Sequence, residues 1–269
     1  MRTFSTSRAG VGLRISTFLV IAFLYVPLAV IVLYAFTTQT SAFTFPPPGL
    51  TTRWWGSALG NSNMWSALRL SLTVAAIATI GAVVIGGFLA AAVYRATFFG
   101  RNALSLLVVL PIALPGIVTG IALNNAFQVL GINFGLFTVV VGHATFCIVV
   151  VYNNVLARLR RTAGNVVEAS ADLGAGMLQT FRYVTFPLLR SALLAGALLA
   201  FALSFDEVIV TTFTAGPATE TLPIWILSNL FRPNQAPIVN AVAAALIVLS
   251  VIPVWLAQRL SSDTTGGRI

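Results

Sequence analysis

The feature that most constrains this chain is one long segment without any charge. From Asn102 to Ala157 there is no Asp, Glu, Lys or Arg. A helix needs about 20 mostly apolar residues to cross a bilayer, so this segment is long enough for more than one crossing. Across the whole chain 8% of the residues are charged and 58% are apolar, whereas an ordinary soluble domain has about 25% charged residues. We therefore predict an all-α integral membrane protein.

Six apolar stretches have the length of a crossing helix. The third and fourth belong to the uncharged segment, which we divide at the polar Asn124-Asn125 pair and at Gly131–Asn133, where a short loop would let the chain reverse. Six crossings would place both termini on one side. The predicted spans are Ile15–Phe36, Leu70–Val93, Leu104–Leu123, Phe134–Leu156, Ser191–Thr212 and Ile238–Ala257.

The arginines predict the orientation of these helices. Cytoplasmic loops carry an excess of Lys and Arg, and all 15 basic residues of this chain are Arg. Only Arg53, Arg69 and Arg232 fall on one side, so the side with the other arginines and both termini is predicted to be cytoplasmic. The net charge of +9 follows from this topology, and no basic cluster indicates binding to nucleic acid.

The chain has too few metal-binding side chains for a metal centre. Its single cysteine is Cys147 and its single histidine is His143, which exclude a Cys/His cluster, so no metal site is predicted. No Asp, Glu, Lys or Arg shares the predicted span of His143, and a proton relay would need such a partner. We expect His143 to form a hydrogen bond with a neighbouring helix.

The connection between the fourth and fifth spans, residues 157–190, is too patterned for a linker. Asn165 can cap a helix, and Glu168 stands three positions later as in a capping box. Gly174 stands where a left-handed residue would end that helix. We expect a short helix, a glycine break and a second amphipathic piece before Pro187, which together form a rigid knob suited to a groove of another protein.

This connection resembles the EAA motif of permeases of binding-protein-dependent ABC importers. The family pattern is E-A-A, three residues, G, nine residues and I-x-L-P, and the chain has Glu168-Ala169-Ser170, Gly174 and Val184-Thr185-Phe186-Pro187 at the same spacings. Ser170, Val184 and Phe186 are conservative departures. The resemblance implies that a partner ATPase docks on Glu168, Ala169, Ser170, Asp172, Leu173, Gly174 and Pro187.

A wider similarity, from about Asn63 to Arg259, is with the polyamine (spermidine/putrescine) permease group. It is carried by Leu110-Pro111 through Pro115-Gly116, by Gly142–Phe146, and by Leu203-Ser204-Phe205-Asp206-Glu207 followed by Thr211–Phe213. It implies six transmembrane helices with a cytoplasmic coupling-helix loop between the fourth and fifth. The implied divisions are 1–62 (cytoplasmic tail, first helix and first extracytoplasmic loop), 63–258 (type-1 ABC transmembrane domain) and 259–269 (cytoplasmic tail).

The resemblance also implies a function. The chain would be a permease subunit of an ATP-driven importer in a bacterial cytoplasmic (inner) membrane, surrounded by lipid and forming half of the pore for a small cation such as putrescine or spermidine. Two ATPase subunits, a second and non-identical permease and an extracytoplasmic solute-binding protein would complete the importer. The chain lacks a G-x-x-x-x-G-K-[ST] loop, so it is not expected to be an enzyme or to hold a cofactor, and ATP and Mg would bind the partner ATPase.

Asp206 and Glu207 are the only acidic residues in a predicted span. A carboxylate near the bilayer centre costs about 2.5–3.5 kcal/mol on insertion scales, so such residues usually face a cavity or a partner. Adjacent helical residues point about 100° apart, so one carboxylate would attract the cation and the other would pair within the protein. The alternative is an ion pair with Arg69. Pro115 and Gly116, where proline interrupts the third span, are the other pathway candidates.

Two other function classes stay open at this point. A membrane enzyme could use Asp206 and Glu207 as paired carboxylates, although the 157–190 connection would then have no role. An ion-coupled secondary transporter could bind its driving ion at the same acids, and it predicts internal repeats, which the sequence does not show.

Overall fold

The computed structural model describes residues 10–40, 44–95, 99–161, 165–232 and 234–262. These residues form helices and connecting turns, and their one β-interaction is an isolated antiparallel bridge between Thr37 and Leu50. The predicted all-helical architecture is confirmed. The chain divides into two compact units, which we call the terminal unit (residues 1–62 and 226–269) and the central unit (residues 63–225).

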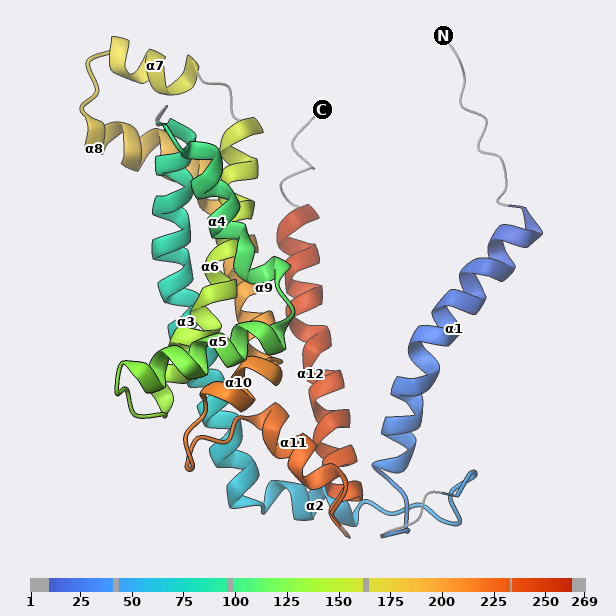
Figure 1. Ribbon diagram of the computed structural model, residues 1–269. Helices are drawn as coiled ribbons and strands as arrows, with labels where there is room; N and C mark the ends of the chain where they lie inside the picture. The colour runs from blue at the N-terminus through green and yellow to red at the C-terminus, as the bar shows by residue number, and fades with distance from the viewer. Residues whose placement is uncertain (1–9, 41–43, 96–98, 162–164, 233, 263–269) are drawn as a thin grey trace. The chain divides into compact units, whose positions relative to one another are not determined.

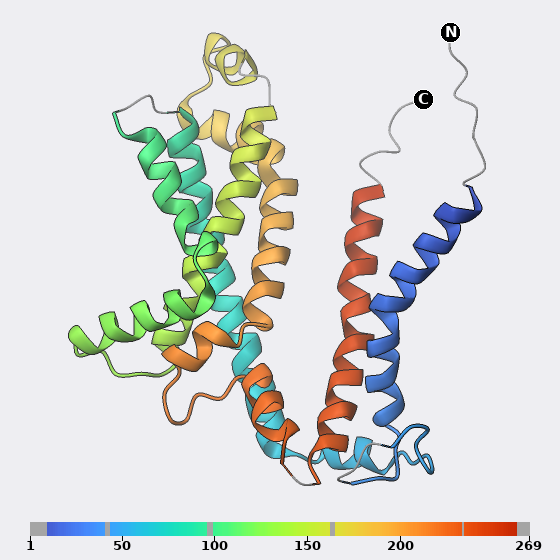
Figure 2. The ribbon, with the colours of Figure 1, turned by 45° about the vertical axis from the view of Figure 1, so that its right-hand side comes forward.

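The terminal unit is built on α1 (Val11–Tyr34), α2 (Arg53–Leu59) and α12 (Ala236–Ser262). Both α1 and α2 pack against α12, and Figure 2 shows that α1 begins and α12 ends at the same end of this unit. Trp54 closes the loop that follows α1, because its buried indole N–H donates a hydrogen bond to the carbonyl of Thr37 at 2.7 Å.

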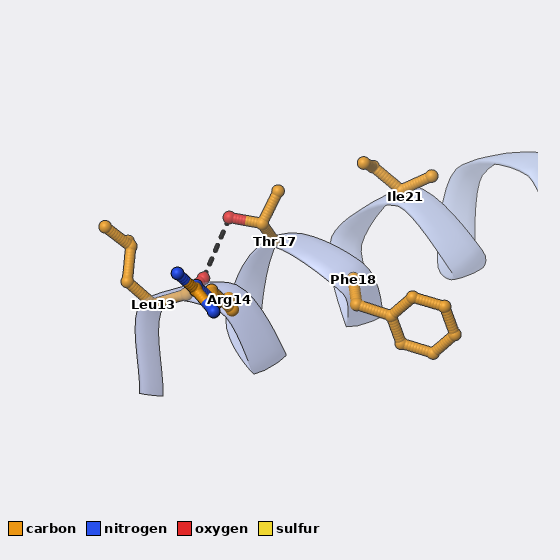
Figure 3. Close-up of a pocket in the computed structure, with 5 residues that line it drawn as sticks. All are labelled: Leu13, Arg14, Thr17, Phe18 and Ile21. Atoms are coloured by element: carbon orange, nitrogen blue, oxygen red, sulfur yellow. Dashed lines mark hydrogen bonds between the residues drawn. The ribbon is translucent and has the colours of Figure 1, made fainter. Parts of the chain in front are cut away.

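A shallow hollow lies on the exposed surface of α1 (Figure 3). A single helix supplies its whole lining, and its one internal hydrogen bond runs from the hydroxyl of Thr17 to the carbonyl of Leu13 at 2.8 Å. Within the described part of the chain no second element lines it. Its lining residues are Leu13, Arg14, Thr17, Phe18 and Ile21.

The core of the central unit forms where α3 (Ser62–Arg95), α6 (Leu136–Arg161) and α9 (Phe186–Phe205) meet. Small side chains let these helices approach closely, as is typical of membrane helix packing. A Cβ added to Gly86 would lie 2.8 Å from the carbonyl oxygen of Ile148, and one added to Gly196 would lie 3.2 Å from the Cα of Val151. The two glycines therefore seat α3 and α9 directly on the backbone of α6.

The third predicted span, Leu104–Leu123, is interrupted at Pro115, as the proline predicted. Here α4 (Arg101–Ala113) ends, α5 (Gly116–Val129) begins, and the helices are bent by 104°. Leu114 is extended with ψ 146°, because a following proline disfavours the helical region, and Pro115 has no N–H with which to continue the hydrogen-bond ladder. The break expected at Pro115 thus divides this span into two helices, whereas Pro111 lies inside α4.

The predicted division at Asn124-Asn125 is wrong. Both residues lie inside α5, which continues to Val129. The chain reverses at Gly131, whose φ of +65° is one that glycine adopts without strain, as expected for the Gly131–Asn133 turn. Polar residues in an apolar run therefore did not mark a loop, and the glycine did.

The fifth predicted span, Ser191–Thr212, is broken as well. Helix α9 ends at Phe205, and the short α10 (Ile209–Thr214) begins after an irregular segment at residues 206–208. Asp206 and Glu207 therefore lie between two helices. The expectation that they project from one helix about 100° apart is overturned.

The 157–190 connection holds α7 (Asn165–Asp172), α8 (Met177–Thr180) and a π-helical turn, η1 (Phe181–Thr185). The turn leads directly into α9, so Met177–Phe205 forms one apolar helical rod of 29 residues. Pro187 lies in the first turn of α9 and does not separate the connection from the span.

Four helical segments among the described residues are long and apolar enough to cross a membrane: α1, Ser62–Tyr94 of α3, α6 and Met177–Phe205. The bent α4 and α5 pair adds a fifth crossing if the two form one span. Helix α12 has a shorter apolar helical part, Ala236–Ser250, and α11 (Leu222–Leu230) precedes it.

The close approach at Gly86 predicts a stability difference between two glycines of α3. Gly86→Ala should destabilise the protein by roughly 1–3 kcal/mol, since the added methyl would overpack the contact with Ile148. Gly81→Ala, with nothing within 4 Å of its added Cβ, should be neutral or stabilising by roughly 0.5–1 kcal/mol. Thermal unfolding in detergent measures both, and equal midpoints would contradict the packing.

Candidate functional site

The two helix breaks of the central unit meet at α10. A Cβ added to Gly116 at the start of α5 would lie 3.7 Å from Ile209, which begins α10, and one added to Gly120 would lie 2.6 Å from the ring of Phe213. Helices α5 and α10 therefore pack side by side and run in the same direction (Figure 1). Each of the two predicted pathway pairs, Pro115-Gly116 and Asp206-Glu207, thus stands at the N-terminal end of one of two packed helices.

Side chains satisfy the backbone of the short α10 at both of its ends. At the N-terminal end, the Oε1 of Glu207 accepts the N–H of Val210 at 2.8 Å. At the C-terminal end, the Nδ2 of Asn124 donates to the carbonyl of Phe213 at 2.6 Å, and the hydroxyl of Thr138 donates to the next carbonyl at 2.7 Å. An unsatisfied backbone group in lipid costs several kcal/mol. These three side chains therefore stabilise the short α10, which begins after a break in the span.

His143 joins the two sides of the α9–α10 break. It is only 1% exposed, and from α6 its Nδ1 lies 2.7 Å from the hydroxyl of Ser204 in the last turn of α9. Its Nε2 lies 2.8 Å from the hydroxyl of Thr211 in α10. Thr211 in turn donates to the carbonyl of Glu207 at 2.9 Å. The expected hydrogen bond to a neighbouring helix is confirmed, and it is made to two helices.

The two carboxylates have different surroundings. Glu207 is partly buried and caps α10, so it is the acid that pairs within the protein. Asp206 is exposed, and within the described part of the chain its carboxylate has no hydrogen bond or ion pair; the alternative ion pair with Arg69 is not formed there either. One free and one engaged carboxylate are not the converging pair that the enzyme alternative requires.

Six of the seven docking candidates of the 157–190 connection lie on α7 or in the turn that ends it, and Pro187 lies in the first turn of α9. Helix α7 ends in a Schellman turn, in which the N–H of Gly174 donates to Ala171 at 2.9 Å and the N–H of Ala175 donates to Ser170 at 3.1 Å. Gly174 has φ +79°, a conformation that a side chain would strain. This position therefore requires glycine.

Three large apolar side chains project from this turn. Leu173, Met177 and Leu178 are 88%, 85% and 78% exposed. Ser170 differs from the other candidates, because its hydroxyl lies 3.0 Å from that of the buried Thr180 and links α7 to α8. The exposed docking candidates are Glu168, Ala169, Asp172, Leu173, Gly174 and Pro187.

Four residues that build the α9–α10 break were not predicted as site residues. In the sequence each is an uncharged polar residue within an apolar stretch. When such a side chain is buried, it is expected to form a hydrogen bond with a neighbouring helix. At Asn124 this pattern was interpreted as a turn. The four are Asn124, Thr138, Ser204 and Thr211. Among the described residues no group of three or more His, Cys, Asp and Glu could hold a metal ion.

Two adjacent asparagines of α5 test this arrangement. Asn124→Leu removes the donor to the carbonyl of Phe213 and should cost about 1–3 kcal/mol, because that carbonyl loses its partner. Asn125→Leu is the matched control, since Asn125 is exposed, and its effect should be within about 0.5 kcal/mol. Thermal unfolding in detergent measures both variants. Equal destabilisation would show that the cap contributes nothing.

Comparison with known proteins agrees with the fold and with the resemblance in the sequence. Residues 82–266 match the family described as "Binding-protein-dependent transport system inner membrane component". A crystal structure of a bacterial ABC transporter involved in the import of the acidic polysaccharide alginate superposes with a TM-score of 0.65 and 18% identity, over 96% of this chain and 99% of that one. At that identity the likeness concerns the fold alone.

Two curated relatives match nearly the whole chain. The spermidine/putrescine transport system permease protein PotC of Escherichia coli (strain K12) is 35% identical over 246 residues, which are 91% of this chain and 92% of PotC. The putrescine transport system permease protein PotI of the same strain is 34% identical over 254 residues, which are 92% of this chain and 89% of PotI. The chain belongs to the family of binding-protein-dependent transport system inner membrane components.

Proposed function

We propose that this chain is a permease subunit of an ATP-driven importer and forms half of the pore for a small cation, a polyamine such as putrescine or spermidine. The observation that carries the proposal is the identity of 35% and 34% to PotC and PotI over more than nine-tenths of the chain. The exposed carboxylate of Asp206 supports a cationic solute. An ion-coupled transporter and a membrane enzyme are not favoured.

The proposed subunit crosses the inner membrane six times, with α4 and α5 as one broken span and both termini in the cytoplasm. Its transmembrane domain is residues 63–258, preceded by residues 1–62 and followed by the tail 259–269. Figure 1 shows the ends of α3 and α6 and the start of α4 at the same end of the central unit as α7 and α8. Arg101, Arg158 and Arg160 mark this end as cytoplasmic by the positive-inside rule.

The α7–α8 knob is the proposed docking surface for one of two cytoplasmic ATPase subunits, which bind ATP and Mg. Leu173, Met177 and Leu178 are exposed apolar side chains at the arginine-rich end. Exposure of apolar side chains to water is unfavourable, and burial against a partner removes this free-energy cost. A second, non-identical permease and an extracytoplasmic binding protein complete the assembly.

Docking predicts that charge at the knob abolishes association with the ATPase. Leu173→Asp and Gly174→Asp should each reduce co-purification of the ATPase at least tenfold, since a buried unpaired carboxylate opposes binding. Because Leu173 is 88% exposed, its replacement leaves the fold of the chain intact. Phe231→Asp, at another exposed residue (83%), is the matched control and should retain the ATPase. Full association of both knob variants would remove this surface from the interface.

The proposed solute contact is Asp206 rather than Glu207. Asp206 is exposed beside the α5 and α10 helix starts, whereas the carboxylate of Glu207 is engaged by Val210. At an effective dielectric constant of 20, two opposite unit charges 4 Å apart attract by about 4 kcal/mol, which is enough to make one carboxylate important for passage of a polycation.

Uptake into proteoliposomes tests both the function and this residue. The assembled importer with its binding protein should accumulate putrescine or spermidine only when ATP is supplied, and Asp206→Asn should reduce uptake at least tenfold without loss of the ATPase. Glu207→Gln is the control, because its amide oxygen can still accept the N–H of Val210. Uptake driven by an ion gradient without nucleotide would overturn the function, and undiminished uptake by Asp206→Asn would remove this residue from the pathway.

A further inference from the structure

We propose that His143 is a positioning residue that holds the α9–α10 break in the orientation in which Asp206 faces the solute. The inference rests on the proposed function for its transport readout, and on the geometry of the break for everything else. Its basis is a directional chain of four hydrogen-bonding groups, Ser204, His143, Thr211 and Glu207, which connects α9, α6 and α10.

The hydrogen bonds of this chain favour one tautomer of His143. Thr211 has one hydroxyl hydrogen, and it is donated to the carbonyl of Glu207 at 2.9 Å. With that hydrogen so directed, the Nε2 of His143, 2.8 Å from the same hydroxyl oxygen, is the donor of their bond. A neutral imidazole has one donor and one acceptor, so Nδ1 accepts the hydroxyl hydrogen of Ser204 at 2.7 Å. With Nε2–H, every member of the chain is satisfied.

This chain of bonds brackets Asp206. Two residues before it, Ser204 is attached to α6 by its hydroxyl; one residue after it, Glu207 is attached through its carbonyl to Thr211 and so to the same imidazole. Asp206 itself has no side-chain partner among the described residues. The orientation of its carboxylate is therefore set by its neighbours, and their only shared connection to α6 along these bonds is His143.

The same geometry argues against a proton relay through His143. The chain ends at the backbone carbonyl of Glu207, which accepts a hydrogen bond but does not pass a proton on. Its other end is the hydroxyl of Ser204, which is 2% exposed. A buried chain that ends on a carbonyl and a serine has no entry or exit for a proton, so its role is to hold geometry.

His143→Phe and His143→Gln separate hydrogen bonding from packing. Phenylalanine keeps a planar ring but forms no hydrogen bond, whereas glutamine offers one donor and one acceptor, as the neutral imidazole does. We expect His143→Phe to reduce polyamine uptake at least tenfold while ATPase association persists, and His143→Gln to retain at least half of the uptake. Equal loss in both variants would overturn the proposal in favour of packing.

Thiol labelling provides a readout that does not depend on transport. Cys147 is the chain's single cysteine and is buried one turn from His143, with its thiol 3.4 Å from the carbonyl of Ala200. Cys147→Ala is therefore both the matched control, with normal uptake expected, and a background in which Asp206→Cys is the only thiol. In the assembled complex, adding His143→Phe should lower the maleimide labelling rate of Asp206→Cys at least threefold, because the released segment no longer holds position 206 exposed. An unchanged or higher rate would overturn the proposal.

The two readouts keep this proposal separate from the proposed function. If the unsubstituted complex transports no polyamine, the proposed function fails, and labelling still decides the role of His143. If His143→Phe does not assemble, Thr211→Val replaces it, since this variant keeps the side-chain shape and removes the hydroxyl that joins Nε2 to Glu207. It should lower labelling to a similar extent, and an unchanged rate would again overturn the proposal.

Discussion

The central unit depends on one constraint, that every backbone N–H and C=O within a bilayer must find a partner inside the protein. An unbroken helix meets it without help, but this chain breaks two of its spans, after Ala113 and after Phe205. The second break persists because side chains replace the lost backbone partners of α10: Asn124 of α5 and Thr138 of α6 at its end, and Glu207 of the preceding segment at its start. Polar residues in these apolar helices thus permit the irregular segments in which pathway candidates lie.

Close helix contact is the second requirement, because a side chain can cap another helix only when the two backbones are near. Gly116 and Gly120 bring α5 against α10, and Gly142 brings α6 against it, with an added Cβ 3.0 Å from Val210. These glycines come one or two turns from Asn124 on α5, and next to His143 on α6. Each glycine allows the two helix backbones to approach closely, and the neighbouring polar side chain can then form a hydrogen bond across that short distance.

The sequence predicted those parts of the fold that depend on apolar length. Helices α1, α3 and α6 have nearly the predicted positions, since hydropathy over about 20 residues decides them. The interruption at Pro115 was expected from the proline itself, although its 104° bend was not. The break at Asp206 was missed, because both sides of it are equally apolar and only contacts distant in the sequence reveal where that helix stops. The same limit applies to the site: adjacency made Asp206 and Glu207 equivalent candidates, and only the hydrogen bond from Val210 distinguishes them.

The helical rod from Met177 to Phe205 connects the α7–α8 knob to the segment that contains Asp206. Its 29 residues extend about 43 Å at about 1.5 Å each, from the exposed knob to the residue before Asp206. The bond between Ser170 and Thr180 ties α7 to the start of this rod, and the bond between Ser204 and His143 ties its end to α6. The one irregular turn between these ties is η1, a π-helical segment of the kind often found at functional sites. A displacement of the knob therefore either bends the rod at η1 or acts on the hydrogen bonds that orient Asp206.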